Sequence, residues 1–171
     1  MTTPFDDLAT PTIVACRIAM TPCMLGKQYK EHLLREAKRK MEKTSDKQMG
    51  VLLRVEKIHR ILKENIGTMI PEVLCRVSFD VLAYRPCVGD HIQMTIQKIF
   101  HHGVFFQDIL RVLIPSSDCS PFVIQKDFSS FFLQHKTTIL RKGDPATILI
   151  RQIRFEKDGF SCIGKLVTDL Q

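Results

Sequence analysis

Several features that mark whole classes of protein are missing from this chain of 171 residues. No apolar run reaches the roughly 18–20 residues that a membrane-spanning helix needs. The first eleven residues, MTTPFDDLATP, are acidic and polar, and they lack the basic segment and apolar core of a secretory signal. We therefore expect neither a secretory signal nor a membrane partner.

Catalytic signatures are also missing. The sequence contains no GxSxG, no HExxH, no Walker loop and no dinucleotide-binding GxGxxG. Three aspartates, Asp90, Asp144 and Asp158, lie beside glycines in predicted turns, where an aspartate commonly bonds to the local backbone. We see no activated nucleophile, and we predict a non-catalytic protein without a cofactor.

The six cysteines are scattered singly, at Cys16, Cys23, Cys75, Cys87, Cys119 and Cys162. The absence of a CxxC pair argues against a zinc ribbon or a thioredoxin-type site. Several lie in strand-like segments, where a reduced cysteine behaves as a small buried hydrophobe, so we expect a reducing compartment. The pair His101-His102 lacks a third ligand, which favours a polar turn over a metal site.

Positive charge is what the chain has in excess. Its net charge is +7 and its pI is about 9.2, which favours a polyanionic partner such as RNA, DNA or an acidic protein surface. Residues 27–63 contain twelve lysines and arginines against five acids, whereas the rest is close to neutral. The alternative for such a run is a solvated helix face.

The first half predicts a strand over Thr12–Met20 and a helix over about Gln28–Met41. An apolar stripe on that helix comprises Tyr29, Leu33, Leu34, Ala37 and Met41. The remaining face is cationic and comprises Lys30, Arg35, Lys38, Arg39 and Lys40. The helix therefore buries one side, and its other side either meets an acidic or nucleic-acid surface or is solvated.

The segment Val51–Leu62 fits two patterns. Its apolar residues keep a helical spacing in part, while Leu53 to Glu56 alternate as a strand would. The preceding Gly50 and the β-branched content favour a strand. Because Arg76–Tyr84 also alternates well, we predict a small α/β domain with one helix on an antiparallel sheet.

The second half predicts five strands, over Asp90–Phe100, Val104–Asp108, Leu110–Ile114, Ala146–Phe155 and Phe160–Val167. Gly103 allows a tight reversal between the first two strands, and Lys157-Asp158-Gly159 forms a hairpin turn. Ser116–Ile139 is a long insertion, in which we expect a short helix or turn near Ser129–Leu133. Five strands with this insertion predict an oligonucleotide-binding (OB) Greek-key barrel.

The predicted fold is thus α+β in two domains. A flexible arm covers residues 1–11, the α/β domain covers 12–86, and the barrel covers 87–171. A short rigid joint, comprising Tyr84, Arg85, Pro86 and Gly89, separates the two domains.

An OB barrel binds single strands through an electropositive groove with exposed aromatic side chains. The candidate RNA-binding residues are Lys98, His101, His102, Phe105, Phe106, Arg111, Arg151, Arg154 and Lys157. Adjacent strand residues face opposite ways, so at least one of Phe105 and Phe106 belongs to the core. Arg151 and Arg154, three apart, are expected at the two ends of a groove instead of in one clamp.

Two stretches carry a resemblance to a family. One is V-G-D-x-I-x-x-x-I-x-x-I-x-x-x-G-V-F-F over Val88–Phe106, followed by a strand closing at Ile114-Pro115. The other is the Lys157-Asp158-Gly159 turn followed by I-G-K-L and Asp169. Together with the strand Arg76–Tyr84, they resemble the stalk subunits of multisubunit DNA-directed RNA polymerases, such as the seventh subunit of eukaryotic RNA polymerase II and its archaeal counterpart.

The resemblance implies a docking domain beside the polymerase clamp, a barrel that contacts nascent single-stranded RNA, and a small helical partner subunit. Docking candidates are Lys30, Arg35, Lys38, Arg39, Met69, Ile70 and Pro71. Residues 48–69 are more basic than the family pattern, which fits a divergent or viral member. The expected location is the nucleus, or the cytoplasm or virion for a viral protein. The alternatives are a free-standing OB-fold RNA-binding factor in translation or RNA processing, and an assembly module whose barrel binds no nucleic acid.

Overall fold

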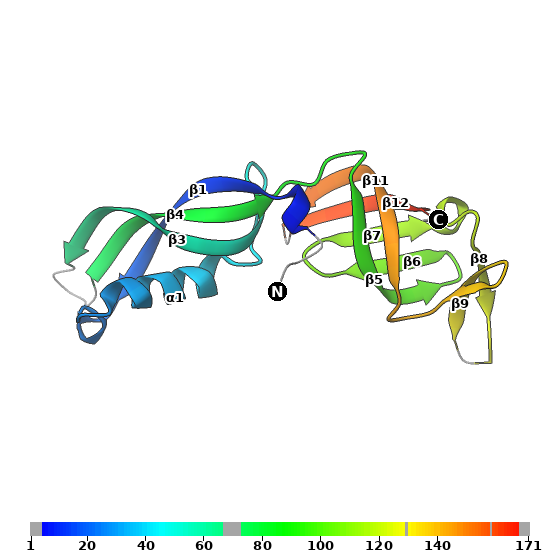
Figure 1. Ribbon diagram of the computed structural model, residues 1–171, viewed down its shortest axis with the longest axis horizontal. Coiled ribbons are helices and arrows are strands. Elements are labelled where there is room, and N and C mark those ends of the chain that lie inside the picture. The colour runs from blue at the N-terminus through cyan, green and yellow to red at the C-terminus, as the bar shows by residue number, and fades with distance from the viewer. Residues whose placement is uncertain (1–4, 67–72, 129, 158, 168–171) are drawn as a thin grey trace. The chain divides into compact units, whose positions relative to one another are not determined.

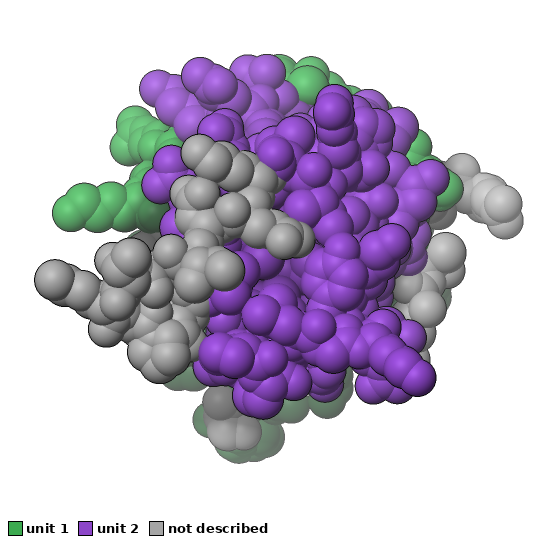
Figure 2. Space-filling model, turned by 90° about the vertical axis from the view of Figure 1, so that its left-hand side faces the viewer, with its two compact units in different colours: residues 1–7, 86–171 green, residues 8–85 purple. Residues whose placement is uncertain are grey.

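A computed structural model describes residues 5–66, 73–128, 130–157 and 159–167, with side chains at 63–66 left aside. The chain divides into two compact units (Figure 2). The sheet unit is Leu8–Arg85, and the barrel unit is Pro86–Gln171 together with Met1–Asp7. Within the described ranges, no helix is long and apolar enough to cross a membrane.

The sheet unit is an antiparallel sheet with one helix, α1, on one face (Figure 1). Its strands are β1 (Thr10–Met20), β2 (Ser45–Asp46), β3 (Gly50–Ile66) and β4 (Val73–Tyr84), in the order β1-β4-β3-β2. Short 3-10 helices lie at Asp6–Leu8 and Pro22–Met24. The sheet begins two residues before the predicted strand, so part of the expected arm is strand, and Phe5 is fully buried.

The helix α1 (Tyr29–Met41) confirms the predicted amphipathic helix. Leu33, Ala37 and Met41 are buried, and Tyr29 and Leu34 pack beside them. These side chains meet the alternate residues of β4 that were predicted to share a face, namely Val77, Phe79, Val81 and Ala83. Burial of a leucine such as Leu33 contributes about 1.5–3 kcal/mol, so packing on the sheet stabilises this helix more than its sequence propensity does.

Backbone and side-chain bonds tie the end of α1 to β3. The Glu42 carboxylate accepts the Val55 N–H at 3.1 Å. The Lys43 N–H donates to the Leu52 carbonyl at 2.7 Å, and the Thr44 hydroxyl donates to the Met41 carbonyl at 2.6 Å. Lys43 has φ 64, the left-handed conformation that commonly ends a helix. The helix therefore leads directly into the sheet.

The strand β3 explains why its sequence fitted two patterns. Against β4 its register slips four times, between Leu52 and Arg54 and then at every third residue to Lys63. Each slip is a β-bulge, which places one extra residue on the bulged strand. The residues facing the helix therefore recur every third position, at Leu52, Val55, Ile58 and Ile61. This repeat of three lies between the strand period of two and the helical period of 3.6.

The barrel unit contains five barrel strands: β5 (His91–Phe100), β6 (Gly103–Gln107), β7 (Arg111–Pro115), β11 (Pro145–Glu156) and β12 (Gly159–Val167). They close in the order β11-β12-β7-β6-β5, with β11 also pairing with β5. All pairs are antiparallel except β12 with β7. The predicted five-stranded barrel is confirmed at the level of an OB-like fold.

The details of the barrel follow the predicted alternation. Ile92, Met94 and Ile96 of β5 are buried, whereas the residues between them are exposed. A Cβ at Gly103 would collide with the Ile114 carbonyl oxygen, so this tight reversal requires glycine. The predicted aspartate turns also occur: Asp90 accepts the Cys87 N–H at 2.8 Å, and Asp144 accepts the Arg141 N–H at 2.7 Å. Asp158 lies outside the described residues.

The long insertion between β7 and β11 differs in part from the prediction. It forms a three-stranded sheet of β8 (Val123–Lys126), β9 (Phe131–His135) and β10 (Thr138–Leu140), preceded by a 3-10 helix at Ser116–Asp118 (Figure 1). Of the helix or turn expected near Ser129–Leu133, the turn occurs between β8 and β9, where the Asp127 N–H donates to the Ser130 carbonyl at 2.8 Å, and the chain from Phe131 on is strand. Leu133 and Phe122 are buried. Phe131 and Phe132 are half-buried on β9, whereas Phe128 is fully exposed before it.

Candidate nucleic-acid interface

The register of the barrel aligns two rows of residues on its outer face. The first row crosses all five strands as Gln152, Ile163, Leu113, Phe105 and Lys98. The second crosses four strands as Arg154, Ser161, Arg111 and Gln107. Their neighbours along the strands, such as Cys162, Val112 and Phe106, are buried. We call these two lines the barrel rows.

The first barrel row is apolar at its centre. Leu113 is 44% exposed and Ile163 is 36% exposed, which is high for aliphatic side chains on a small barrel. Phe105 is half-buried between Leu113 and Lys98. Phe106 is fully buried, which confirms that at least one of the two adjacent phenylalanines belongs to the core. The row thus presents one half-buried aromatic side chain and two aliphatic surfaces.

Arg151 and Arg154 both lie in the lining of one surface depression. A β-bulge between Ile150 and Gln152 brings both arginines to one surface depression, because the extra residue changes the alternation. This depression of about 430 Å³ is lined by Val88, Arg151, Gln152, Ile153, Arg154, Glu156, Ser161 and Ile163. Arg151 also lies 3.4 Å from the Asp118 carboxylate. The two arginines therefore share one site.

Arg111 is the member of the barrel rows whose charge is incompletely satisfied. Its side chain is half-buried, and its Nη2 atom is buried without a hydrogen-bond partner among the described residues. A buried charged donor without an acceptor is costly, and the cost is relieved when an anionic oxygen reaches it. Arg111 is paired in register with Ser161, which lines the arginine depression.

The other predicted RNA-binding residues lie at the two ends of the barrel rows. His101 and His102 are exposed at the β5–β6 turn, with their rings stacked at 4.9 Å. Next to that turn, the Lys98 ammonium lies 4.9 Å from the Phe100 ring centroid. Lys157 is exposed beyond Arg154, at the opposite end. Within the described ranges, no group of three metal-binding side chains occurs.

The cationic face of α1 is exposed, as predicted, but some of its charge is already engaged. Arg39 donates to Glu36 at 3.0 and 2.8 Å, and Arg35 lies 2.7 Å from His32 Nδ1. Lys30 and Lys38 are exposed on the same face. The remaining docking candidates, Met69, Ile70 and Pro71, lie outside the described residues.

The joint residues fall on both sides of the division between the units. Tyr84 closes β4 and is buried, and Arg85 is exposed in the sheet unit. Pro86 is buried and Gly89 is exposed in the barrel unit. The Gly89 N–H donates to the Ile150 carbonyl at 2.9 Å, so the barrel fold begins immediately after this joint.

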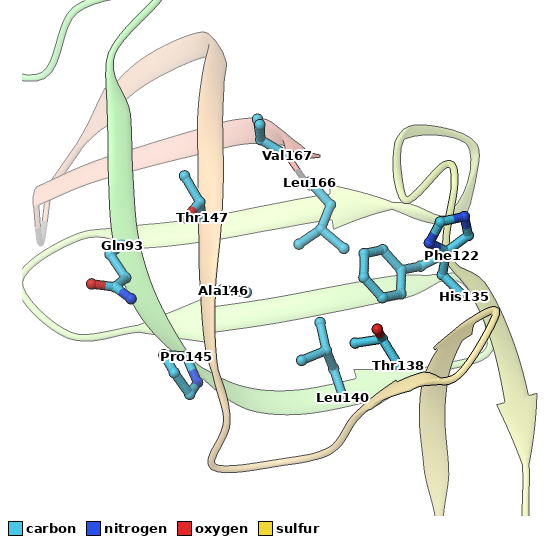
Figure 3. A pocket seen from close by; sticks show the side chains of 10 residues that line it. All are labelled: Gln93, Phe122, His135, Thr138, Leu140, Pro145, Ala146, Thr147, Leu166 and Val167. Atoms are coloured by element: carbon cyan, nitrogen blue, oxygen red, sulfur yellow. The ribbon is translucent and has the colours of Figure 1, made fainter. Parts of the chain in front are cut away.

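A second pocket of about 240 Å³ lies where the insertion meets the barrel (Figure 3). Phe122, Leu140 and Leu166 extend their apolar side chains into it. His135 lies at its margin, with its ring 5.5 Å from Phe122, edge to face. The sequence prediction missed this pocket because the insertion was not expected to form a sheet.

The cysteines are free thiols, and two of them have a raised pKa. All six are free. Burial, and then the nearby Asp118, raises the pKa of Cys119 to about 11. Burial, and then Asp90, raises the pKa of Cys162 to about 11. Both thiols are therefore protonated and poorly nucleophilic at neutral pH.

No protein-family model and no curated protein sequence matches this chain. The arrangement itself joins cations, aliphatic surface and one aromatic ring on a single barrel face. Such a surface suits a flexible polyanion, because arginines bind phosphate oxygens while bases cover apolar side chains.

Proposed function

We propose that this chain is a non-catalytic stalk subunit of a DNA-dependent RNA polymerase. Its sheet unit docks at the clamp, and its barrel contacts nascent RNA. The observation that carries the proposal is the order of the parts: a helix-backed antiparallel sheet is followed at once by an OB-like barrel whose outer face bears the barrel rows. The sequence resemblance to polymerase stalk subunits supports the same interpretation.

On the barrel, phosphate and base contacts have separate positions. Arg111, Arg151 and Arg154 supply donors for phosphate oxygens. Phe105 supplies a ring on which a base stacks, a contact that contributes about 1–3 kcal/mol, and Leu113 and Ile163 supply aliphatic surface beside it. These three apolar side chains contact any base equally well, because they offer no hydrogen bonds to its edge. We therefore expect weak sequence preference, which suits a subunit that receives every transcript.

Affinity purification tests the proposal. The tagged full-length chain, expressed in its natural cells and recovered at low salt, should bring down the two largest polymerase subunits and a small helical partner. A matched chain with the barrel substitutions Arg111→Glu, Arg151→Glu and Arg154→Glu should recover the same subunits with less crosslinked RNA. Recovery of no polymerase subunit would refute the proposal.

A free-standing RNA-binding factor is the second candidate, because the barrel rows alone form a complete single-strand surface. Such a factor would bind RNA in isolation, and it would be recovered without polymerase. Sedimentation of cell extract distinguishes the two, since a stalk subunit sediments with the polymerase and a free factor sediments at its own mass of 19.7 kDa.

A further inference from the structure

The open face of the sheet unit, opposite α1, carries an unexpected group of cations. In β3 the residues that face α1 recur every third position. Arg54, Lys57 and Arg60 lie between them, on the face of the sheet away from α1. On β1 and β4, Arg17 and Arg76 lie on this same side. We call these five residues the cationic sheet face. All five side chains are exposed.

Three of these cations are crowded together. Arg17 and Arg76 are direct cross-strand partners, and Arg60 lies opposite Ser78, two residues along β4 from Arg76. Like charges directly opposite each other destabilise a sheet. In the described part of the chain, the three guanidinium groups have neither an ion pair nor a hydrogen bond. Asp80, an acid on this face, is engaged by Lys57 of the same face at 3.5 Å and by His59 at 2.9 Å.

The exposed aliphatic residues of this face lie mainly on β1, the strand at one margin of the sheet. On β1, the exposed residues are Pro11, Ile13, Ala15 and Ala19, and Ile13 is 57% exposed. Leu74 on β4 is 40% exposed. Arg54, Lys57 and Arg60 lie on β3, whereas Arg17 lies among the aliphatic residues of β1 and Arg76 lies on β4. Within the described residues this face exposes no phenylalanine or tyrosine, and the exposed His59 ring is engaged by Asp80.

We propose that the cationic sheet face docks an acidic amphipathic helix of a partner protein. Leucine-like side chains of that helix cover the β1 margin, and its carboxylates reach Arg17, Arg60 and Arg76. Among its described residues this face exposes no phenylalanine or tyrosine, and its His59 ring is engaged by Asp80, which disfavours single-stranded nucleic acid because such a ligand needs stacking platforms. A helix on each face is an ordinary layer arrangement for a sheet. The inference rests on the proposed docking role and names the chemistry of the docked segment.

The geometry sets the length of the segment. From Ile13 to Ala19 the strand runs roughly 20 Å at about 3.3 Å per residue. A helix of about 14 residues spans the same distance. The probe is therefore a fluorescent peptide of about 14 residues, built from Leu, Glu and Ala, with leucines and glutamates on adjacent sides of one helix. A second peptide replaces each Leu with Ser, and a third probe is oligouridylate of about 12 nucleotides.

Fluorescence anisotropy with the full-length chain gives the test. The triple variant Arg17→Gln, Arg60→Gln and Arg76→Gln should weaken binding of the Leu-containing peptide by roughly tenfold or more, since three charge-assisted contacts are lost. The variant Lys30→Gln, Arg35→Gln and Lys38→Gln tests the rival cationic face on α1, and the inference expects it to keep the wild-type affinity. The control Lys27→Gln, Lys47→Gln and Lys142→Gln, at three exposed lysines outside both faces, should also bind as the wild type does. The Ser-containing peptide should bind the wild type more weakly, because the β1 margin is left uncovered.

Other outcomes overturn the inference. Equal peptide affinity of the sheet variant and the wild type would show that the cationic sheet face does not bind the peptide. Loss of affinity in the α1 variant alone would show that the peptide binds α1 instead. Loss of oligouridylate binding in the sheet variant, with the peptide unaffected, would make the face a nucleic-acid surface. Failure of the proposed function is separate, because polymerase recovery is measured with the wild-type chain and peptide binding with the purified protein.

Discussion

The barrel rows and the cationic sheet face both present arginines on an exposed β surface, yet their surroundings differ. In the barrel, Phe105, Leu113 and Ile163 lie beside the cations in one continuous line. On the sheet, Arg17 and Arg76 lie among aliphatic residues of β1 and β4, and the described residues of the open face expose no phenylalanine or tyrosine. Positive charge alone selects polyanions, whereas the neighbouring apolar side chains select which polyanion binds. We therefore expect RNA on one surface and an acidic helix on the other.

The largest effect is expected from charge reversal on the barrel. The variant Arg111→Glu, Arg151→Glu and Arg154→Glu should lower oligouridylate affinity by roughly a hundredfold or more, and the slope of log K against log salt should shrink by about 2 because three phosphate contacts are lost. Filter binding across a salt series measures both quantities. The control Lys30→Glu, Arg35→Glu and Lys38→Glu makes the same charge change on α1. An equal loss of oligouridylate affinity in this control would show that net charge, and not the position of the arginines on the barrel, determines RNA binding.

The aromatic side chain should matter next. Phe105→Ala should weaken oligouridylate binding by roughly tenfold, near the lower part of the stacking range because the ring is half-buried. Phe105→Leu, which keeps apolar surface without a ring, should recover part of that loss. Unchanged oligouridylate affinity in Phe105→Ala would show that RNA does not stack on Phe105. Phe106→Ala is a fold control, expected to destabilise the barrel by about 3–5 kcal/mol.

Alkaline pH should weaken the barrel unit. The pKa of Cys119 and that of Cys162 are raised from 9.0 to about 11 in the fold. Between these values the unfolded chain releases thiol protons that the folded chain keeps, so the free energy of unfolding falls as pH rises. Denaturant unfolding from about pH 8 to about pH 10.5 measures this slope. In the double variant Cys119→Ala and Cys162→Ala, the free energy of unfolding should depend less steeply on pH. An unchanged slope would show that other groups cause the pH dependence.

The smallest effect concerns the cross-strand arginines. Arg76→Gln should raise the free energy of unfolding by about 0.2–1 kcal/mol, because it removes the like-charge pair with Arg17. A purely structural role for Arg76 predicts the opposite sign. Chemical denaturation gives the value, and Lys38→Gln on α1 is the control. Increased stability together with weaker peptide binding would identify a surface maintained for binding at the expense of stability.

The elements themselves could be predicted because simple periods govern them. The apolar stripe of α1 and the alternation of Ile92, Met94 and Ile96 follow the regular repeats of helix and strand. The bulged regions could not be predicted so well. Bulges in β3 and at Arg151 change which side chains share a face, and they arise from pairing with a distant strand. The cationic sheet face and the shared arginine depression were missed for this reason.

The most direct test places a photo-crosslinking amino acid at Leu113 of the barrel and, in a separate chain, at Ile13 of the sheet. Both positions are exposed and neither is a charged residue. After irradiation in cells, the chain labelled at Leu113 should carry a ribonuclease-sensitive adduct, and the chain labelled at Ile13 should carry a protease-sensitive adduct to an acidic polymerase-associated protein. RNA crosslinked at Ile13, or no RNA at Leu113, would contradict the account.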